Sequence, residues 1–85
     1  MILTNIKQIE LKANYIKDFN VLKKYKDTLE IIELNKNDIS DISYLSEFVK
    51  ECKKLTKISL KGNKIDLNNE YNKKIITHTK QKVLI

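Results

Sequence analysis

Several residue types are rare or missing in this chain, and each absence excludes a class of protein. Its 85 residues include one cysteine, one glycine and no proline. A single cysteine excludes an internal disulfide framework, and a single glycine excludes a glycine-rich phosphate-binding loop. The apolar stretches all fall short of the roughly 20 residues that a membrane-spanning helix needs, and the start of the chain lacks a signal-peptide pattern. We therefore expect a cytoplasmic or nuclear protein with no membrane association.

Side chains that usually carry catalysis or bind metals are also few. His78 is the single histidine, and it has no second histidine or cysteine at a metal-ligand spacing. Cys52 lies far from it in the sequence, at a position that fits the apolar side of a helix, which indicates a small buried residue. The sequence gives little support to a nucleophilic Cys-His pair. We expect no enzymatic activity, no cofactor and no metal.

The charge is one-sided, with a formal net charge of +6 at pH 7. Clustered cations attract nucleic acids and acidic surfaces. All 17 cationic residues are lysine, however, and arginine is the residue that contacts phosphate and guanine through a planar fork. Two interpretations stay open, an ordinary solvated surface and a basic ribonucleoprotein or nucleic-acid-associated component.

One spacing of apolar residues and asparagine occurs three times along the chain. In residues 29–45, LEIIELNKNDISDISYL, it is LxxLxLxxNxI, from Leu29 to Ile39. The same frame fits within residues 3–16, where Leu3 precedes Ile6, Ile9, Leu11, Asn14 and Ile16, and it fits again in residues 55–65. The frame's asparagines are residues 14, 37 and 63, so successive copies lie 23 and 26 residues apart. Such a period is typical of an array of similar structural units.

The types of residue in the frame predict its geometry. Its second and third apolar positions alternate with polar ones, which predicts a short strand with one buried face. These inward pairs are Ile9 and Leu11, Ile32 and Leu34, and Ile58 and Leu60. Asparagine at the end of each strand is placed to hydrogen-bond the backbone of the turn and of its neighbour. Gly62 precedes the last of the three, where a sharp turn favours a residue without Cβ.

Helical spacing fills the intervals between the predicted strands. A short helical segment is expected through residues 19–25, with Asp18 as its cap, and a helix over residues 42–53, with Ser40 or Asp41 as its cap. A last helix is predicted to begin after Asn68 or Asn69. Its Tyr71, Ile75 and Ile76 should cover the end of the apolar core, with Glu70 one turn from Lys73 and Lys74.

On the basis of these residues and their spacing, the chain resembles the leucine-rich repeat proteins, especially their short-repeat cytosolic and nuclear group. That group includes a protein phosphatase regulatory subunit, an axonemal dynein light chain and a spliceosomal snRNP subunit. The resemblance implies an α/β solenoid, with a short curved parallel sheet on the concave side and helical segments behind it. It divides one domain, residues 1–85, into repeats at about 3–25, 26–51 and 52–67 and a C-terminal cap at 68–85. In the cap, Tyr71, Ile75, Ile76 and a last strand at residues 83–85 match the family's pattern.

The resemblance also implies a function, since such proteins generally bind partners on the concave face. We expect a protein-protein interaction module, a scaffold or regulatory subunit, with another protein as its partner. In this face Ile31 is the candidate anchor, and Glu10 beside Glu33 is a candidate acceptor for a basic group. The predicted partner-binding residues are Gln8, Glu10, Lys12, Ile31, Glu33, Asn35, Lys57, Ser59 and Lys61.

A further interpretation concerns the N-terminal end of the array. Only Met1 and Ile2 precede the first frame, whereas repeat arrays normally carry a capping unit at each end. An exposed strand edge pairs readily with another chain. The chain could therefore be a structural subunit that completes a larger assembly, or associates with itself, through the edge formed by residues 3–11.

Overall fold

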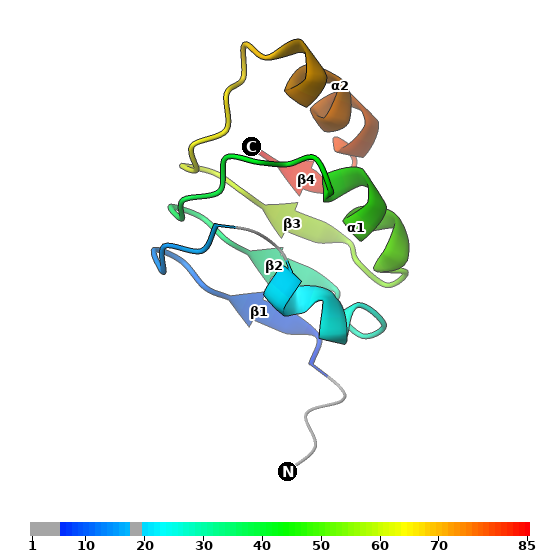
Figure 1. The fold of residues 1–85 in the computed structure, drawn as a ribbon. Coiled ribbons are helices and arrows are strands. Elements are labelled where there is room, and N and C mark those ends of the chain that lie inside the picture. Colours follow the sequence, from blue (N-terminus) through cyan, green and yellow to red (C-terminus); the bar gives the residue numbers. More distant parts are fainter. Residues whose placement is uncertain (1–5, 18–19) are drawn as a thin grey trace.

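Short strands alternate with helical segments along the chain. The computed structural model describes residues 6–17 and 20–85, which form a small mixed α/β fold (Figure 1). In chain order the elements are β1 Gln8–Glu10, the 3-10 helix η1 Asn20–Tyr25, β2 Ile31–Glu33, α1 Leu45–Glu51, β3 Lys57–Ser59, α2 Glu70–Thr79 and β4 Val83–Leu84.

The strands form one parallel sheet whose spatial order, β1-β2-β3-β4, is the chain order. Ile9 pairs with Ile32, Ile32 with Ile58, and Ile58 with Val83, so one row of β-branched residues crosses the whole sheet. Helical segments connect successive strands and lie along one side of the sheet (Figure 1). The prediction of three parallel strands, with a further strand at residues 83–85, is confirmed.

The core lies between the sheet and the helical segments. Ile32 and Ile58 are fully buried, and Leu34 and Leu60 just beyond the strands are buried with them. From the helical side, Phe48 of α1 completes this cluster. The equivalent residues of the first frame, Ile9 and Leu11, are only half-buried. Among the described residues their strand has a neighbour on one side only, so the first layer of the core is less complete than the second and third.

Two of the three frame asparagines form the predicted ladder. Asn37 is 3% exposed; its Oδ1 accepts from the backbone N–H of Asn14 and Ile16, at 2.8 and 3.0 Å. Its Nδ2 donates to the carbonyl oxygens of Leu11 and Asn35, at 2.7 and 3.3 Å. Asn63 bonds the preceding turn in the same way.

Asn14 departs from the ladder. It is exposed, and its side chain donates to the carbonyl oxygen of Lys12 two residues away. Each ladder asparagine bonds to the turn of the preceding copy, and the described residues contain no turn before that of Asn14. The prediction of three equivalent ladder residues is therefore wrong for the first.

The residue before each frame asparagine has a positive φ. Ala13, Lys36 and Gly62 have φ values of 58°, 57° and 74°. The left-handed conformation reverses the chain sharply at the end of each strand, and only glycine adopts it without steric cost. A Cβ on Gly62 would lie 3.1 Å from Cγ of Lys36, because successive turns stack closely. The special role predicted for Gly62 thus belongs to a position that all three copies share.

Two helical segments occur where they were predicted, and the second of them is shorter than predicted. The segment expected at residues 19–25 is the 3-10 helix η1, and its predicted cap Asp18 and first apolar residue Phe19 lie outside the described residues. The helix expected over residues 42–53 is α1, Leu45–Glu51.

The predicted caps of α1 are wrong. Tyr44 is its N-cap, without a side-chain hydrogen bond to the helix. The Asp41 carboxylate instead accepts from the backbone N–H of Ser43 at 2.9 Å, and hydrogen bonds from Ser43 lower the pKa of Asp41. This turn occupies the residues that would otherwise extend the helix.

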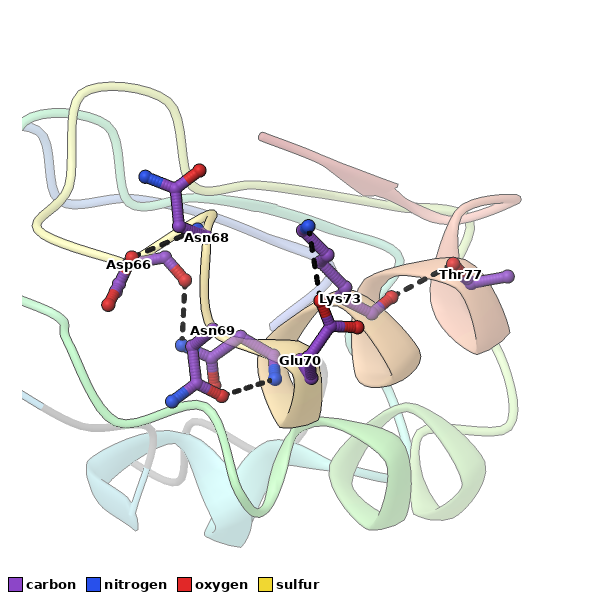
Figure 2. Close-up of polar contacts among 7 residues, drawn as sticks. Asp66, Asn68, Asn69, Glu70, Lys73 and Thr77 are labelled. Carbon is purple, nitrogen blue, oxygen red and sulfur yellow. Dashed lines mark hydrogen bonds and ion pairs between the residues drawn. The ribbon is translucent and has the colours of Figure 1, made fainter.

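The last helix begins as predicted. Asn69 is the N-cap of α2, and its side chain accepts from the backbone N–H of Asn72 at 3.0 Å. Figure 2 shows the surrounding contacts, including the pair between Glu70 and Lys73 at 3.5 Å. Ile75 is buried, but Tyr71 is 59% exposed, so the prediction that Tyr71 covers the core is wrong. It lies one turn before Ile75, on the exposed first turn of the helix.

Candidate functional site

The face of the sheet away from the core carries the residues predicted for partner binding. We call it the outward face and define it by the nine predicted residues. The sheet register places Gln8 beside Ile31 and Ile31 beside Lys57, which forms a first row. A second row runs through Glu10, Glu33 and Ser59. The predicted lateral order is therefore present in the structure.

The third row lies just beyond the strands, at Lys12, Asn35 and Lys61. Backbone pairing continues there, since the N–H of Ala13 donates to the carbonyl oxygen of Asn35 at 3.0 Å. The N–H of Lys36 donates likewise to the carbonyl oxygen of Lys61 at 2.8 Å. The three predicted residues thus lie in consecutive, directly bonded turns.

Exposure differs across the outward face. Gln8, Glu10, Lys12 and Lys61 are exposed, and Ile31, Glu33, Asn35 and Lys57 are half-buried. Ser59 differs from the expectation of an accessible position, because it is 3% exposed. Leu84 of β4 pairs with Ser59 in the register and lies beside it, and leucine is much larger than serine. Ser59 is thus unable to offer much surface to a partner.

The carboxylates of the outward face have local hydrogen-bond or ionic partners. Glu10 and Glu33 are neighbours in the register, as predicted, and like charges opposite one another are unfavourable. Nε2 of Gln8 donates to Oε1 of Glu10 at 2.7 Å, and Nζ of Lys57 lies 3.9 Å from Oε1 of Glu33. Both pairs are solvent-accessible, and such pairs exchange readily with an incoming charged group. A partner's basic group would therefore compete with Gln8 and Lys57 for these two carboxylates.

Asn35 has a structural role at the edge of this face. Its Oδ1 accepts from the hydroxyl of Ser59 and from the backbone N–H of Lys61, the latter at 3.1 Å. This asparagine therefore joins the second and third frames through side-chain contacts. Its substitution would alter the turn as well as the surface.

One apolar residue of the outward face was missed by the sequence reasoning. Leu84 is 40% exposed and lies in the row of Glu10, Glu33 and Ser59. The alternation of a fourth strand at residues 83–85 was the signal that could have identified it, since Val83 points to the core and its neighbour must point away. Ile31 and Leu84 are thus the apolar side chains among these rows.

The remaining reactive side chains lie away from the outward face. Cys52 is fully buried, and burial together with the nearby Glu51 carboxylate raises the pKa of its thiol to about 11. Nδ1 of His78 lies 2.7 Å from the carbonyl oxygen of Lys74, so it carries the proton of that hydrogen bond. Within residues 6–17 and 20–85, no group of three or more histidine, cysteine or acidic side chains is arranged to hold a metal ion. Among the helices of those residues, none is long and apolar enough to cross a membrane.

Comparison of the chain with protein-family models, with curated proteins and with solved structures finds no match.

Proposed function

We propose that this chain is a short leucine-rich repeat solenoid that serves as a protein-protein interaction module. In this proposal its outward face is the concave face, and a partner protein binds there. The chain acts as a scaffold or regulatory subunit and performs no chemistry of its own.

The solenoid part of the proposal is supported by features that recur with the frame. Each copy supplies one short strand, and the strands are parallel neighbours in chain order. Each copy also turns through a left-handed residue just before its asparagine, and the second and third asparagines bond the turn before their own. Stacked units of this kind bury a common core that no single unit could form alone.

One observation carries the binding part of the proposal. Within the described residues the helical segments lie on the other side of the sheet and leave the outward face uncovered (Figure 1). In its row of the outward face, the apolar side chain of Ile31 lies between the polar Gln8 and Lys57. An apolar anchor with a polar rim is the usual composition of a protein-binding patch. Because Ile31 is half-buried by its own sheet, its side chain is held in place before a partner arrives. Such an anchor loses little conformational entropy on binding.

The test compares the capture of proteins by three forms of the chain as immobilised bait. Ile31→Ser with Glu33→Lys alters the centre of the outward face. Leu67→Ser with Glu47→Lys makes the same chemical changes at two exposed positions outside the sheet. We expect the first variant to reduce the quantity of the wild type's specific partners by roughly tenfold or more, and the second to retain them. Thermal unfolding followed by circular dichroism checks that both variants fold. Full capture by the first variant would refute the concave-face assignment.

A second function has a specific observation in its favour, namely structural assembly through the β1 edge. Ile9, Leu11 and Ile16 are half-buried, whereas the corresponding Ile32, Leu34 and Ile39 are fully buried. A further strand alongside β1 would cover this incomplete layer and pair its free backbone groups. In this second proposal the added strand comes from another copy of the chain. Light scattering should then show a mass that rises with concentration, and a constant single-chain mass would contradict self-association.

A further inference from the structure

A groove lies between α1 and the C-terminal part of α2, away from the outward face. Its lining consists of Ser46, Val49, Lys50, Cys52, Lys53, His78, Thr79 and Lys82. These residues come from α1 and the turn after it, from the last turn of α2, and from the turn before β4. None of the nine outward-face residues belongs to it.

The lining combines an apolar floor with a basic rim. Val49 is half-buried and Cys52 fully buried, while Lys50 near the end of α1 and Lys53 in the turn after it are exposed. Lys82 approaches from the other side of the groove and is half-buried. The lining contains no acidic residue, although three of its eight members are lysines.

The rim lysines have no carboxylate within ion-pair distance in the described part of the chain. The ion pairs found there join Lys57 to Glu33, Lys64 to Asp38 and Lys73 to Glu70. The Cys52 thiol in the floor of the groove is acted on by Glu51 and Asp27, which raise its pKa, and by Lys26 and Lys82, which lower it. Lysines near helix C-termini interact favourably with the helix dipole, which explains one or two such residues. That explanation does not account for Lys82, which belongs to neither helix.

His78 and Thr79 are oriented by hydrogen bonds within α2. The Nδ1–H of His78 donates to the carbonyl oxygen of Lys74, and Oγ1 of Thr79 donates to the carbonyl oxygen of Ile75 at 2.8 Å. These bonds hold the two side chains in place along the groove. Nε2 of His78 makes no hydrogen bond within the described residues, so it is available to a ligand.

We infer that this groove binds an acidic peptide segment of a partner protein, a segment in which carboxylates flank an apolar side chain. The carboxylates pair with Lys50, Lys53 and Lys82, and the apolar side chain lies on Val49. Charge complementarity favours an acidic segment as the occupant of the groove, since each of these lysines gains an opposite charge on binding. A second copy of this chain fits poorly, because its acidic residues are interspersed with lysines and its net charge is +6.

Nucleic acid is the competing occupant, and the lining argues against it. Single-stranded nucleic acids bind to grooves in which bases stack on aromatic rings, often with arginine along the backbone path. The lining has no phenylalanine, tyrosine, tryptophan or arginine, and its one imidazole, that of His78, is hydrogen-bonded through Nδ1 to the carbonyl oxygen of Lys74. Its floor is apolar where base stacking would require a flat ring.

The test measures direct binding of defined probes by fluorescence anisotropy at low ionic strength. The probe is a short fluorescein-labelled peptide of glutamate interrupted by leucine, and its control has glutamine in place of every glutamate. We expect the first to bind and the second not to bind, with an affinity that falls as salt is added. Absence of binding by the glutamate peptide, or equal binding of both peptides, would overturn the inference.

Two matched variants locate the binding. Lys50→Glu with Lys53→Glu reverses two charges on the rim, and Lys7→Glu with Lys17→Glu reverses two exposed charges elsewhere. Because reversal replaces attraction with repulsion, the rim variant should bind the peptide roughly tenfold to a hundredfold more weakly. The matched variant should change the affinity by less than about threefold, because distant charges are screened. Equal losses in both would show a net-charge effect and refute the groove.

Two further measurements separate this inference from its rivals. The outward-face variant Ile31→Ser with Glu33→Lys should bind the peptide like the wild type. Loss of binding in this variant would show that the peptide binds to the outward face and not to the groove. Labelled polyuridine should bind more weakly than the glutamate peptide. Tighter binding of polyuridine that is lost in the rim variant would assign the groove to nucleic acid instead.

Discussion

Substitution of Asn37 by alanine should be among the most damaging single changes at a polar position of this protein. The side chain makes four hydrogen bonds, two accepted and two donated, at 2.7 to 3.3 Å, and three of them join the second frame to the first. It is 3% exposed, and every buried side-chain polar atom in the described ranges has a hydrogen-bond partner. Alanine would remove a hydrogen-bond partner from four backbone groups, of which the Asn35 carbonyl oxygen keeps its bond from the N–H of Ala13, and would add no compensating contact.

The magnitude follows from the number of bonds. A hydrogen bond contributes roughly 0.5 to 1.5 kcal/mol net to stability, which gives about 2 to 6 kcal/mol for four. Some of the freed backbone groups lie near the surface, where water replaces part of the loss, so we expect about 2 to 4 kcal/mol. A chain of this length has a total stability of roughly 4 to 13 kcal/mol. The variant should therefore lose a large share of its stability.

The assay is urea unfolding followed by circular dichroism, with Asn14→Ala as the matched control. Asn14 is exposed and makes one local side-chain hydrogen bond, so its loss should cost less than about 0.5 kcal/mol. An unchanged slope of unfolding free energy against urea would show that only stability has changed. A cost below about 1 kcal/mol for Asn37→Ala, or equal costs for the two variants, would refute the ladder argument.

The remaining predictions concern the turn, the core, the last helix and the thiol. Gly62→Ala should cost about 1 to 2 kcal/mol in urea unfolding because of its positive φ, and an unchanged midpoint would contradict the left-handed turn. Ile32→Ala should cost about 2 to 5 kcal/mol and Ile9→Ala clearly less, since only Ile32 is fully buried; equal losses would contradict the incomplete first layer. Asn69→Ala should cost about 1 kcal/mol and reduce the helical circular dichroism signal, because it removes the cap of α2. The Cys52 thiol should react with Ellman's reagent at pH 8 far more slowly in the native protein than in urea. Because the folded pKa of about 11 exceeds the ordinary 9.0, stability should fall between pH 9 and 11; a rise over that range in urea titrations would contradict the buried thiol.

Much of the sheet could be predicted from the sequence because the relevant signals are local. Alternation around Ile9, Ile32 and Ile58 places one side chain of each strand on the inner face, and pairing of the same frame position in successive copies sets the register. Asparagine at a strand exit identifies the turn whose backbone it bonds. The N-cap at Asn69 is equally local, since it needs only a short polar side chain and the next three residues.

Helix lengths and caps were less predictable because several local hydrogen bonds compete for the same residues. Asp41 could cap a helix or close a tight turn with Ser43, and in the folded chain it closes the turn. The helix therefore begins at Leu45. The prediction from apolar spacing alone therefore extended this helix over residues that form the turn.

The sequence by itself determined the repeating frame, the strand positions and the order of the outward rows, because each depends on spacing along the chain. Only the tertiary structure decided how much surface each position retains. Ser59 is buried beside Leu84, Asn14 has no preceding turn to bond in the part of the chain that the structure describes, and Ile9 is less buried than Ile32. The basic groove also depends on the tertiary structure, since Lys50 and Lys82 both line it although they are 32 positions apart in the sequence. Burial and convergence depend on which neighbours a position acquires in space, and identical local patterns carry no information about that.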